Sequence, residues 1–349
     1  MISGVKIRSL VSVVPKRKLG IEDLVARFGG DNAEKITSTT GVKYRHISED
    51  KKTLDLALEA GKYALEKAGV HSNEIVGIIL VTQTPEYRLP STACILQHML
   101  GIKKTSFALD IGLGCSGFPY GVITAASLIK SGTVSRMLLI SGDLTSMNAS
   151  PEDKSTYPLF ADGFGAIILE GCEDDGDILG YDYGTDGSGW SNMVIHAGMA
   201  KYPKIEDYYK AGADKRYPEV KFPEYAYMDG GQIFTFCLRE VPSMIDRSLA
   251  MASKSKEDID LFLFHQANLF ILKHIGKKMK IPETKIPICL DRYGNTGSSS
   301  IVLAACDHLG GKFNDKHITA AMIAFGVGYS WATVIIRLNP SLVGCIREV

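Results

Sequence analysis

The sequence contains no C-x-x-C pair, no excess charge of either sign and no long apolar run, and each absence excludes a class of protein. Its seven cysteines are scattered, so they suggest no zinc site, redox motif or disulfide framework. The 39 basic and 39 acidic residues cancel, so no net field attracts nucleic acid or an anionic membrane. No stretch approaches the ~20 apolar residues of a membrane span, and residues 1–20 lack a signal peptide's continuous apolar segment. These absences predict a cytoplasmic protein with reduced thiols that binds neither nucleic acid nor membrane.

What is present is typical of a large α/β protein. The 349 residues, 45% of them hydrophobic, suffice for two domains or for one fold built from two halves. Buried-strand patterns alternate with amphipathic helical patterns, which favours α/β architecture. We interpret residues 1–183 and 230–349 as two similar halves, and residues 184–229 as a connecting segment with surface loops. The predicted strands are 75–81, 106–111, 137–141, 165–169 and 259–264, with a hairpin of 317–325 and 329–338, and the predicted helices are 53–68, 115–130, 233–251, 269–279 and 298–309.

Cys115 lies where a predicted strand turns into a predicted helix, among glycines that leave room for a bulky substrate. The pattern places it in the first turn of that helix. Unpaired N–H groups and the helix dipole favour an anion there, and such positions lower a cysteine pKa from ~8.5 toward ~3.5–7.5. We therefore predict a thiolate nucleophile. The alternative is a small buried hydrophobic residue, which is our interpretation of the other six cysteines.

Three further motifs hold groups that suit the same site. His265 follows the strand 259–264, at the carboxyl edge where ligands bind in open α/β sheets. Asn295 lies in a turn of small residues before a helix, and the glycines of 325–329 let the backbone approach a ligand closely. Alone, each motif has a structural alternative: a structural histidine, a turn with an N-cap, or a hairpin turn. Together with Cys115 they supply a nucleophile, two hydrogen-bond donors and an oxyanion site.

In their order along the chain, these motifs resemble the β-ketoacyl-acyl-carrier-protein synthase III family of thiolase-like condensing enzymes. The resemblance runs nearly end to end, and it implies an α/β fold with five αβαβα layers, two similar halves and a homodimer. It also implies an acyltransferase of fatty-acid or specialised biosynthesis that needs no metal and no cofactor. The motifs that carry it are the Cys115 turn, Phe160-Ala161-Asp162-Gly163, His265-Gln266-Ala267-Asn268, Tyr293-Gly294-Asn295-Thr296 and the loop 325–328.

The resemblance assigns roles to the residues. Cys115 would take an acyl group from a thioester, while the backbone N–H groups of Cys115, Val327 and Gly328 hold the oxyanion. Malonyl-acyl-carrier-protein would then lose carbon dioxide, and His265 and Asn295 would stabilise the enolate. That carbanion would attack the acyl thioester and release a β-ketoacyl product. Further substrate contacts are implied at Leu89, Lys154, Gln266, Asn268 and Phe270.

The chain departs from the family pattern near the donor. Lys35 and Thr39 stand where a Trp and an Arg hold the adenine of coenzyme A, and Phe270 replaces an Arg that helps dock the carrier protein. Val327 fills the middle of what is commonly an all-glycine loop. In the family, the loop that resembles residues 85–90 reaches across the dimer to close the partner's acyl pocket, and an aromatic ring often stands where this chain has Leu89.

Four functions compete for these residues. The first is decarboxylative condensation, and the second is acyl transfer to an alcohol or amine with His265 as the base. The pair His265 and Asn295 favours condensation because it suits an enolate oxygen. A papain-like hydrolase lacks support, since the sequence around Cys115 has no Cys-Gly-Ser-Cys-Trp signature. A non-catalytic partner subunit would be marked by loss of the nucleophile, and Cys115 is present.

Overall fold

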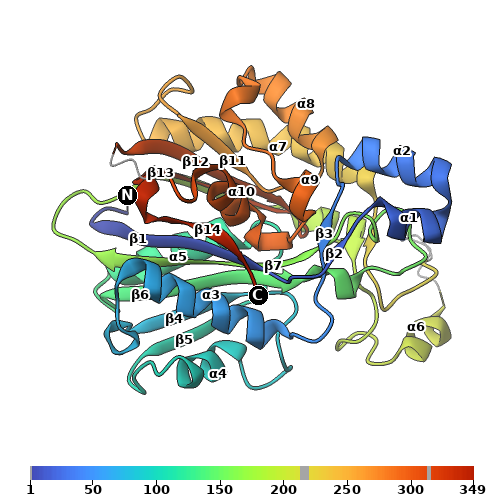
Figure 1. Ribbon diagram of the computed structural model, residues 1–349, viewed down its shortest axis with the longest axis horizontal. Helices are drawn as coiled ribbons and strands as arrows, with labels where there is room; N and C mark the ends of the chain where they lie inside the picture. Colours follow the sequence, from blue (N-terminus) through green and yellow to red (C-terminus); the bar gives the residue numbers. More distant parts are fainter. Residues whose placement is uncertain (1, 213–219, 313–315) are drawn as a thin grey trace.

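Two large β-sheets organise the chain, and the computed structural model describes residues 2–212, 220–312 and 316–349 (Figure 1). The first sheet has six strands in the order β14-β1-β7-β6-β4-β5. Its strands β4, β5 and β6 run parallel to one another, and β7 is antiparallel to both β6 and β1. The strands are β1 (Val5–Val14), β4 (Gly77–Val81), β5 (Phe107–Ile111), β6 (Arg136–Leu144), β7 (Asp162–Gly171) and β14 (Val343–Glu348).

The second sheet has four strands in the order β11-β12-β13-β8. β11 is parallel to β12, and the other two pairs are antiparallel. The two sheets exchange strands: β8 comes before the connecting segment and lies in the second sheet, whereas the C-terminal β14 lies in the first. The strands are β8 (Ile178–Thr185), β11 (Leu261–Phe264), β12 (Ile318–Gly326) and β13 (Ser330–Leu338).

Helices form the remaining three layers. α5 (Gly117–Lys130) and α10 (Ser300–Leu309) lie between the sheets and contact strands of both. α3 (Thr53–Ala68) and α4 (Thr92–Met99) cover the outer face of the first sheet, and α7 (Gly230–Met251) and α8 (Leu269–Met279) cover the second. Three clusters of buried hydrophobic side chains fill the spaces between these layers. The five αβαβα layers expected from the sequence are therefore present.

Shorter elements surround the ends of the strands where the site lies. α2 packs against α8, and β9 pairs with β10 inside the connecting segment. Residues 213–219 of that segment lie outside the described residues. The elements are β2 (Lys18–Leu19), α1 (Ile21–Phe28), α2 (Gly30–Thr40), β3 (Arg45–His46), β9 (Met193–Val194), α6 (Ile205–Ala211), β10 (Tyr227–Met228) and α9 (Leu290–Tyr293).

Most predicted elements exist, with shifted ends. The helices predicted at 53–68 and 269–279 are confirmed at both ends as α3 and α8. The helix predicted at 115–130 begins two residues later, because Cys115 and Ser116 form the turn before it. The helix predicted at 298–309 starts as a 3₁₀ turn at Gly297–Ser299 before α10. β1, β8, β14 and the short helices α1, α2 and α4 were not predicted.

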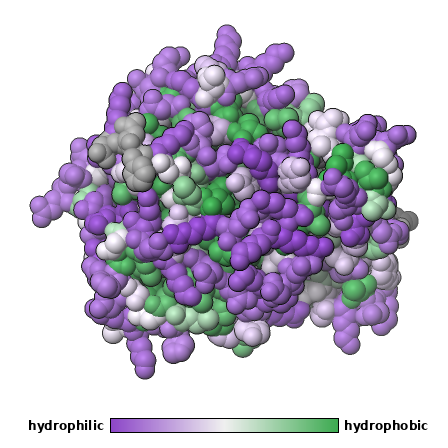
Figure 2. All heavy atoms as spheres, in the orientation of Figure 1, coloured by the Kyte–Doolittle hydropathy of each residue, from purple (hydrophilic) through white to green (hydrophobic). Residues whose placement is uncertain are grey.

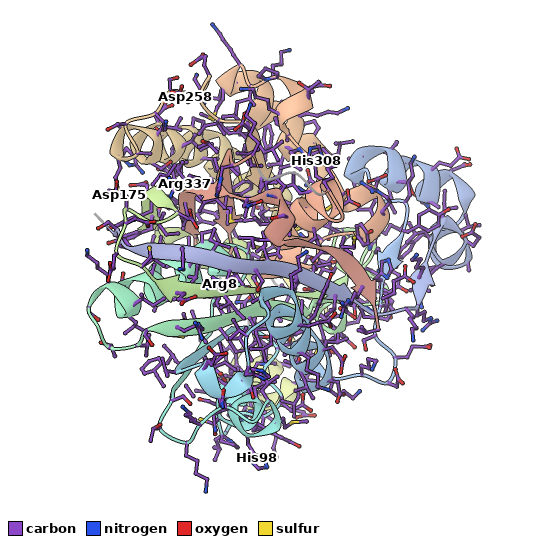
Figure 3. All side chains as sticks on the ribbon, turned by 60° about the vertical axis from the view of Figure 1, so that its left-hand side comes forward. Arg8, His98, Asp175, Asp258, His308 and Arg337 are labelled. Carbon is purple, nitrogen blue, oxygen red and sulfur yellow. The ribbon has the colours of Figure 1, made fainter. Side chains whose placement is uncertain are left out.

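Within each sheet, ion pairs at the surface link neighbouring strands. Arg8 on β1 and Arg136 on β6 both pair with Glu170 on β7, at 2.7 and 2.9 Å. Arg337 on β13 pairs with Asp177 at 3.2 Å, and Arg8 and Arg337 are labelled in Figure 3. Hydrophilic side chains cover most of the face seen in Figure 2, where hydrophobic ones form small areas. No helix among the described residues is long and apolar enough to cross a membrane.

Candidate active site

Cys115 stands in the turn between β5 and α5, one residue before Ser116, the N-cap of the helix. The loop after β12 presses against this turn. A Cβ at Gly326 would lie 2.7 Å from Sγ of Cys115, so only glycine allows the approach. Hydrogen bonds hold the contact, since Ser330 Oγ lies 2.6 Å from Ser116 Oγ and donates to the Val327 carbonyl at 2.8 Å.

Burial controls the ionisation of this sulfur. It raises the pKa of Cys115 to about 11, although the backbone N–H groups of Val327 and of Cys115 itself act in the opposite direction, and the charge of Asp143 raises the pKa further. The sequence-based prediction of a lowered pKa is therefore wrong. Desolvation of the charged form outweighs the N–H groups at the start of α5. Burial therefore favours the thiol over the thiolate at neutral pH.

His265 follows β11 directly and is 1% exposed. Its Nδ1 lies 2.7 Å from Oγ of Ser300, and that oxygen also accepts the Gln266 N–H at 3.1 Å. The hydroxyl hydrogen of Ser300 is available to Nδ1, which would leave the single imidazole proton on Nε2. Burial lowers the pKa of His265 to about 4, partly offset by a backbone hydrogen bond with Gly297. The imidazole is therefore neutral at pH 7.

Asn295 is fixed by contacts from both halves of the chain. Its backbone N–H donates to the Leu159 carbonyl at 2.9 Å, and its carbonyl accepts the Ala161 N–H at 2.9 Å. The motif Phe160-Ala161-Asp162-Gly163 thus positions Asn295. The side-chain oxygen accepts the Gly297 N–H at 3.0 Å. The amide nitrogen donates to the Ala267 carbonyl at 3.4 Å, which is a long hydrogen bond. This arrangement turns the NH₂ group toward the His265 segment as a donor.

Two cavities meet at Cys115. The larger, of about 320 Å³, extends toward the ends of β4 and β6 and will be called the acyl cavity. The smaller, of about 60 Å³, extends toward the start of α8 and contains His265. Cys115 and Asn295 line both. A group attached to the sulfur can therefore occupy one side while a second reactant meets His265 and Asn295 on the other.

The predicted site residues fall into three groups. Cys115, His265, Asn295 and Asn268 line the smaller cavity, and Val327 lines the acyl cavity. Gly328 lines neither, and Leu89, Lys154 and Phe270 lie outside both cavities, exposed on the surface. Lys154 lies 6.0 Å from the ring of Phe28, and Phe270 packs against Phe234 and His274.

Gln266 requires a correction. It was expected to contact substrate, but its side chain is completely buried and turned into the protein. Its amide nitrogen donates to the Phe264 carbonyl at 2.8 Å, and its oxygen accepts the Cys289 N–H at 3.0 Å. With both ends of the amide used by the backbone, Gln266 supports the strand end that carries His265.

Sequence reasoning missed several polar residues of the acyl cavity: Gln83, Asp143, Thr145 and Asn148. Asp143 is buried, and burial raises its pKa despite hydrogen bonds from the Gln83 N–H at 2.6 Å and the Thr82 hydroxyl at 3.0 Å. Their positions just after predicted strands were the available signal, the same one that identified His265. No group of three or more His, Cys, Asp or Glu side chains is arranged to hold a metal within the described ranges.

Comparison with known proteins agrees with this geometry. Residues 109–187 match the family model for 3-oxoacyl-[acyl-carrier-protein] synthase III, and residues 249–338 match the model for its C-terminal part. The β-ketoacyl-[acyl-carrier-protein] synthase III of Listeria welshimeri is 35% identical over 326 residues, 93% of this chain and 96% of that protein. The Clostridium perfringens protein of the same name is 37% identical, covering 87% and 90%.

A solved structure extends the likeness to the whole fold. The 3-oxoacyl-(acyl-carrier protein) synthase of Burkholderia xenovorans has a TM-score of 0.91 and 36% identity, covering 100% of this chain and 98% of that one. The matched regions contain Cys115, His265 and Asn295, the residues that meet at the two cavities. On this evidence the chain belongs to the β-ketoacyl-acyl-carrier-protein synthase III family.

Proposed function

We propose that this protein is an acyltransferase that loads an acyl group onto Cys115 and condenses it with malonyl-acyl-carrier-protein. One observation carries the proposal: the Cys115 sulfur stands between an acyl-sized cavity and a second cavity that contains two neutral hydrogen-bond donors. The relatives with 35–37% identity are named for this synthase activity. The product would be a β-ketoacyl thioester for fatty-acid initiation or a specialised pathway.

In the first half-reaction, the Cys115 sulfur attacks the carbonyl of an acyl thioester. The thiol proton leaves with the departing thiol of the donor, and the new bond is the Cys115 thioester. The N–H groups of Val327 and Cys115, which already face the sulfur, would stabilise the oxyanion. Because the site is buried, these donors act more strongly than they would in water.

In the second half-reaction, malonyl thioester loses carbon dioxide and leaves an enolate. The Nε2–H of His265 and the NH₂ group of Asn295 would donate to its oxygen. The enolate carbon then attacks the Cys115 thioester carbonyl, a carbon–carbon bond forms, and the Cys115 sulfur leaves and regains a proton. Neutral donors suit this step because they bind the developing negative charge without a proton transfer.

The state of His265 separates this function from its nearest competitor. Acyl transfer to an alcohol or amine would use His265 as a general base. An imidazole with a pKa of about 4 is a weak base at pH 7, far from the pKa that a base needs there. A non-catalytic partner subunit is likewise disfavoured, because Cys115 is open to both cavities.

We extend the proposal to assembly and location. The edge strand β5 has an unpaired side, and its central Leu109 is 37% exposed, which supports a homodimer formed along β5. Residues 1–183 supply Cys115 to the site, and residues 230–349 supply His265 and Asn295. The seven unpaired cysteines support a reducing compartment such as the cytoplasm.

The carrier protein would approach from the side of α8. The smaller cavity reaches Asn268 and Ile271 at the start of this helix. Further along α8, Lys273 and Lys277 line a surface groove and present positive charge. These features support docking of an acidic carrier whose phosphopantetheine arm enters beside Asn268.

Intact-mass spectrometry tests the proposal. The protein incubated with acyl-carrier-protein donors should gain one acyl group, and peptide mapping should place it on Cys115. His265→Ala and Asn295→Ala should each abolish decarboxylation of malonyl thioester while self-acylation remains appreciable. An acyl group on Cys94, Cys237 or Cys306 would contradict the role of Cys115 as the nucleophile. Decarboxylation at the parent rate in either variant would contradict the role of His265 and Asn295 in stabilising the enolate.

A further inference from the structure

The acyl cavity has two chemically different walls. Its apolar wall comes from Phe160 and from the connecting segment. Its other wall comes from the ends of β4 and β6 and carries polar side chains. The apolar wall holds Phe160, Met193, Val194, Ile195 and Ala226, and the polar wall holds Gln83, Asp143, Thr145 and Asn148, while Val327 and Asn295 line the cavity as well. A plain hydrocarbon chain matches only the first wall.

Two amides on the polar wall have unused hydrogen-bonding capacity. Within the described part of the chain, no hydrogen-bond partner exists for the side-chain amides of Gln83 and Asn148. The hydroxyl oxygen of Thr145 is buried beside them without a partner either. Asp143 differs, because its carboxylate already accepts hydrogen bonds from Thr82, Gln83 and Ser298. The free capacity is therefore that of neutral groups.

The charge of the lining limits what can bind. No Lys, Arg or His is among the residues described as lining the acyl cavity, so a carboxylate or phosphate on the acyl chain would have no counter-charge. A cationic substituent would face Asp143, whose oxygens are already occupied. An uncharged group that both donates and accepts, as a hydroxyl does, fits two neutral amides.

The place of Gln83 shows how far along the acyl chain such a group would lie. A Cβ at Gly114 would collide with Oε1 of Gln83 and lie 2.7 Å from a methyl group of Val327. Gln83 thus touches the residue that precedes Cys115. A substituent bound at Gln83 must therefore lie close to the thioester carbonyl.

Filling the cavity has an energetic consequence. Open to solvent, the amides of Gln83 and Asn148 bond to water. An unsubstituted chain would expel that water and return no hydrogen bond, which penalises the chain. Sites built to bond a substrate hydroxyl reject the analogue that lacks it more strongly than apolar pockets reject an added methylene.

We propose that the acyl group carried by Cys115 bears an uncharged hydroxyl substituent near its thioester carbonyl, bound by the side-chain amides of Gln83 and Asn148. The inference rests on the proposed function, since it specifies the substrate class for the same acylation step. The chemistry of that step is unchanged: the hydroxyl is not consumed, and only the donor thiol leaves.

A matched pair of donors tests the inference. Butanoyl and 3-hydroxybutanoyl, each on the same acyl carrier protein, differ only in the hydroxyl group. We expect the kcat/KM for acylation of Cys115, followed by intact mass, to be about tenfold higher for 3-hydroxybutanoyl, equivalent to about 1.4 kcal/mol. A kcat/KM equal to or lower than that for butanoyl would overturn the inference.

Variants locate the effect. Asn148→Leu and Gln83→Leu should each lower the preference for 3-hydroxybutanoyl over butanoyl. In the double variant the ratio of the two kcat/KM values should fall to about one, because the advantage of 3-hydroxybutanoyl is lost while loading of butanoyl remains. Ile195→Leu, on the apolar wall, is the matched control and should change both donors alike. A tenfold ratio that survives in the double variant would refute the role of the amides.

The test also separates two kinds of failure. Loading of Cys115 by butanoyl without any hydroxyl preference would overturn this inference and leave the proposed function intact. If no acyl donor modifies Cys115, the proposed function fails and this inference fails with it.

Discussion

At the scale of single residues, the site works with neutral groups. Burial raises the pKa of Cys115 to about 11 and lowers that of His265 to about 4, so neither carries its charge at pH 7. These shifts favour a neutral thiol and a neutral imidazole over a thiolate–imidazolium pair as the resting state. In the proposed reaction, negative charge develops only once substrate is bound and the N–H donors can stabilise it.

This ionisation state predicts a pH profile for alkylation. Because the thiolate fraction rises tenfold per pH unit below the pKa, the rate of Cys115 alkylation by iodoacetamide should still be climbing between pH 9 and pH 10. Peptide mapping of the alkylated protein measures it. The exposed Cys345 is the internal control. A plateau below pH 8 at Cys115 would contradict the raised pKa.

Ser300 is predicted to be a positioning residue for His265. Removing its hydroxyl in Ser300→Ala leaves Nδ1 without the partner that holds the proton on Nε2. We expect decarboxylation of malonyl thioester to fall about tenfold or more, the cost of one misplaced hydrogen bond. Self-acylation of Cys115 should stay within about twofold. Equal losses in both half-reactions would indicate general damage to the fold rather than a role in orienting the imidazole.

Local pattern singled out Cys115, His265 and Asn295, each at a strand end or turn, and the structure brings them together at the two cavities. Their catalytic roles stay predictions, and the pattern did not indicate their environment. The pKa direction of Cys115 was wrong because the loop that buries it comes from Gly326, 211 positions away (326 − 115). Gln266 was misassigned for the same reason, since its partner Cys289 is distant in sequence.

At the scale of elements, helices with a regular apolar period were predictable from the sequence, whereas strands that mix apolar with charged or exposed residues were not. α3 and α8 show sustained apolar periodicity and well-defined ends. β1 carries Lys6 and Arg8 within its apolar residues, and β14 is short and half-exposed, so neither has a clear strand pattern. Their pairing with each other is a long-range property that no local window contains.

The loop after β4 provides a prediction about acyl length. Leu89 is 82% exposed and lies outside both cavities of its own chain, so an effect on acyl length would have to act through the proposed partner subunit. We expect Leu89→Phe to shift loading toward acetyl, whereas the parent loads longer chains at least as well as acetyl. A series of donors from acetyl to dodecanoyl measures the shift. Tyr87→Phe is the matched control in the same loop, and a parent profile peaking at acetyl and unmoved by Leu89→Phe would refute the idea.

The edge of β5 provides a prediction about assembly. Leu109→Lys puts a charge in the middle of the edge strand, where it would be buried in a dimer. Sedimentation should show the parent at about twice 38.0 kDa and the variant at 38.0 kDa. The control variant Met99→Lys, which changes an exposed side chain on α4, should leave the dimer intact. A parent that sediments as a monomer would exclude the proposed interface.

At the scale of the whole molecule, we expect the surface around the donor entrance to determine which thioester is used. Lys35 and Thr39 are exposed on α2 and provide no aromatic platform. Two rings of this region already contact cations: Arg27 and Arg45 lie 4.5 and 4.6 Å from the centre of the Tyr157 ring, and Lys154 lies over Phe28. Without the aromatic platform on α2, we expect an adenine ring to lose its stacking energy, about 1 to 3 kcal/mol.

This loss predicts a preference for carrier-protein donors. The same acyl group should acylate Cys115 with a higher kcat/KM from acyl carrier protein than from coenzyme A, by about five- to a hundredfold. Measuring the kcat/KM of both donors with one acyl group tests this preference. Lys35→Trp should raise the kcat/KM for the coenzyme A donor and leave that for the carrier-protein donor unchanged. Equal or better kcat/KM with coenzyme A in the parent would show that another adenine site exists.

The place of β14 in the first sheet also constrains how the molecule is made. At roughly 5–20 residues per second, the 329 residues (343 − 14) from the end of β1 to the start of β14 take about 20–70 s to translate. Throughout that interval the edge of β1 that later receives Val343–Glu348 has no neighbour, because β14 has not yet been made. An open strand edge invites pairing with other nascent chains. The nascent protein is thus open to such pairing until Val343–Glu348 close that edge.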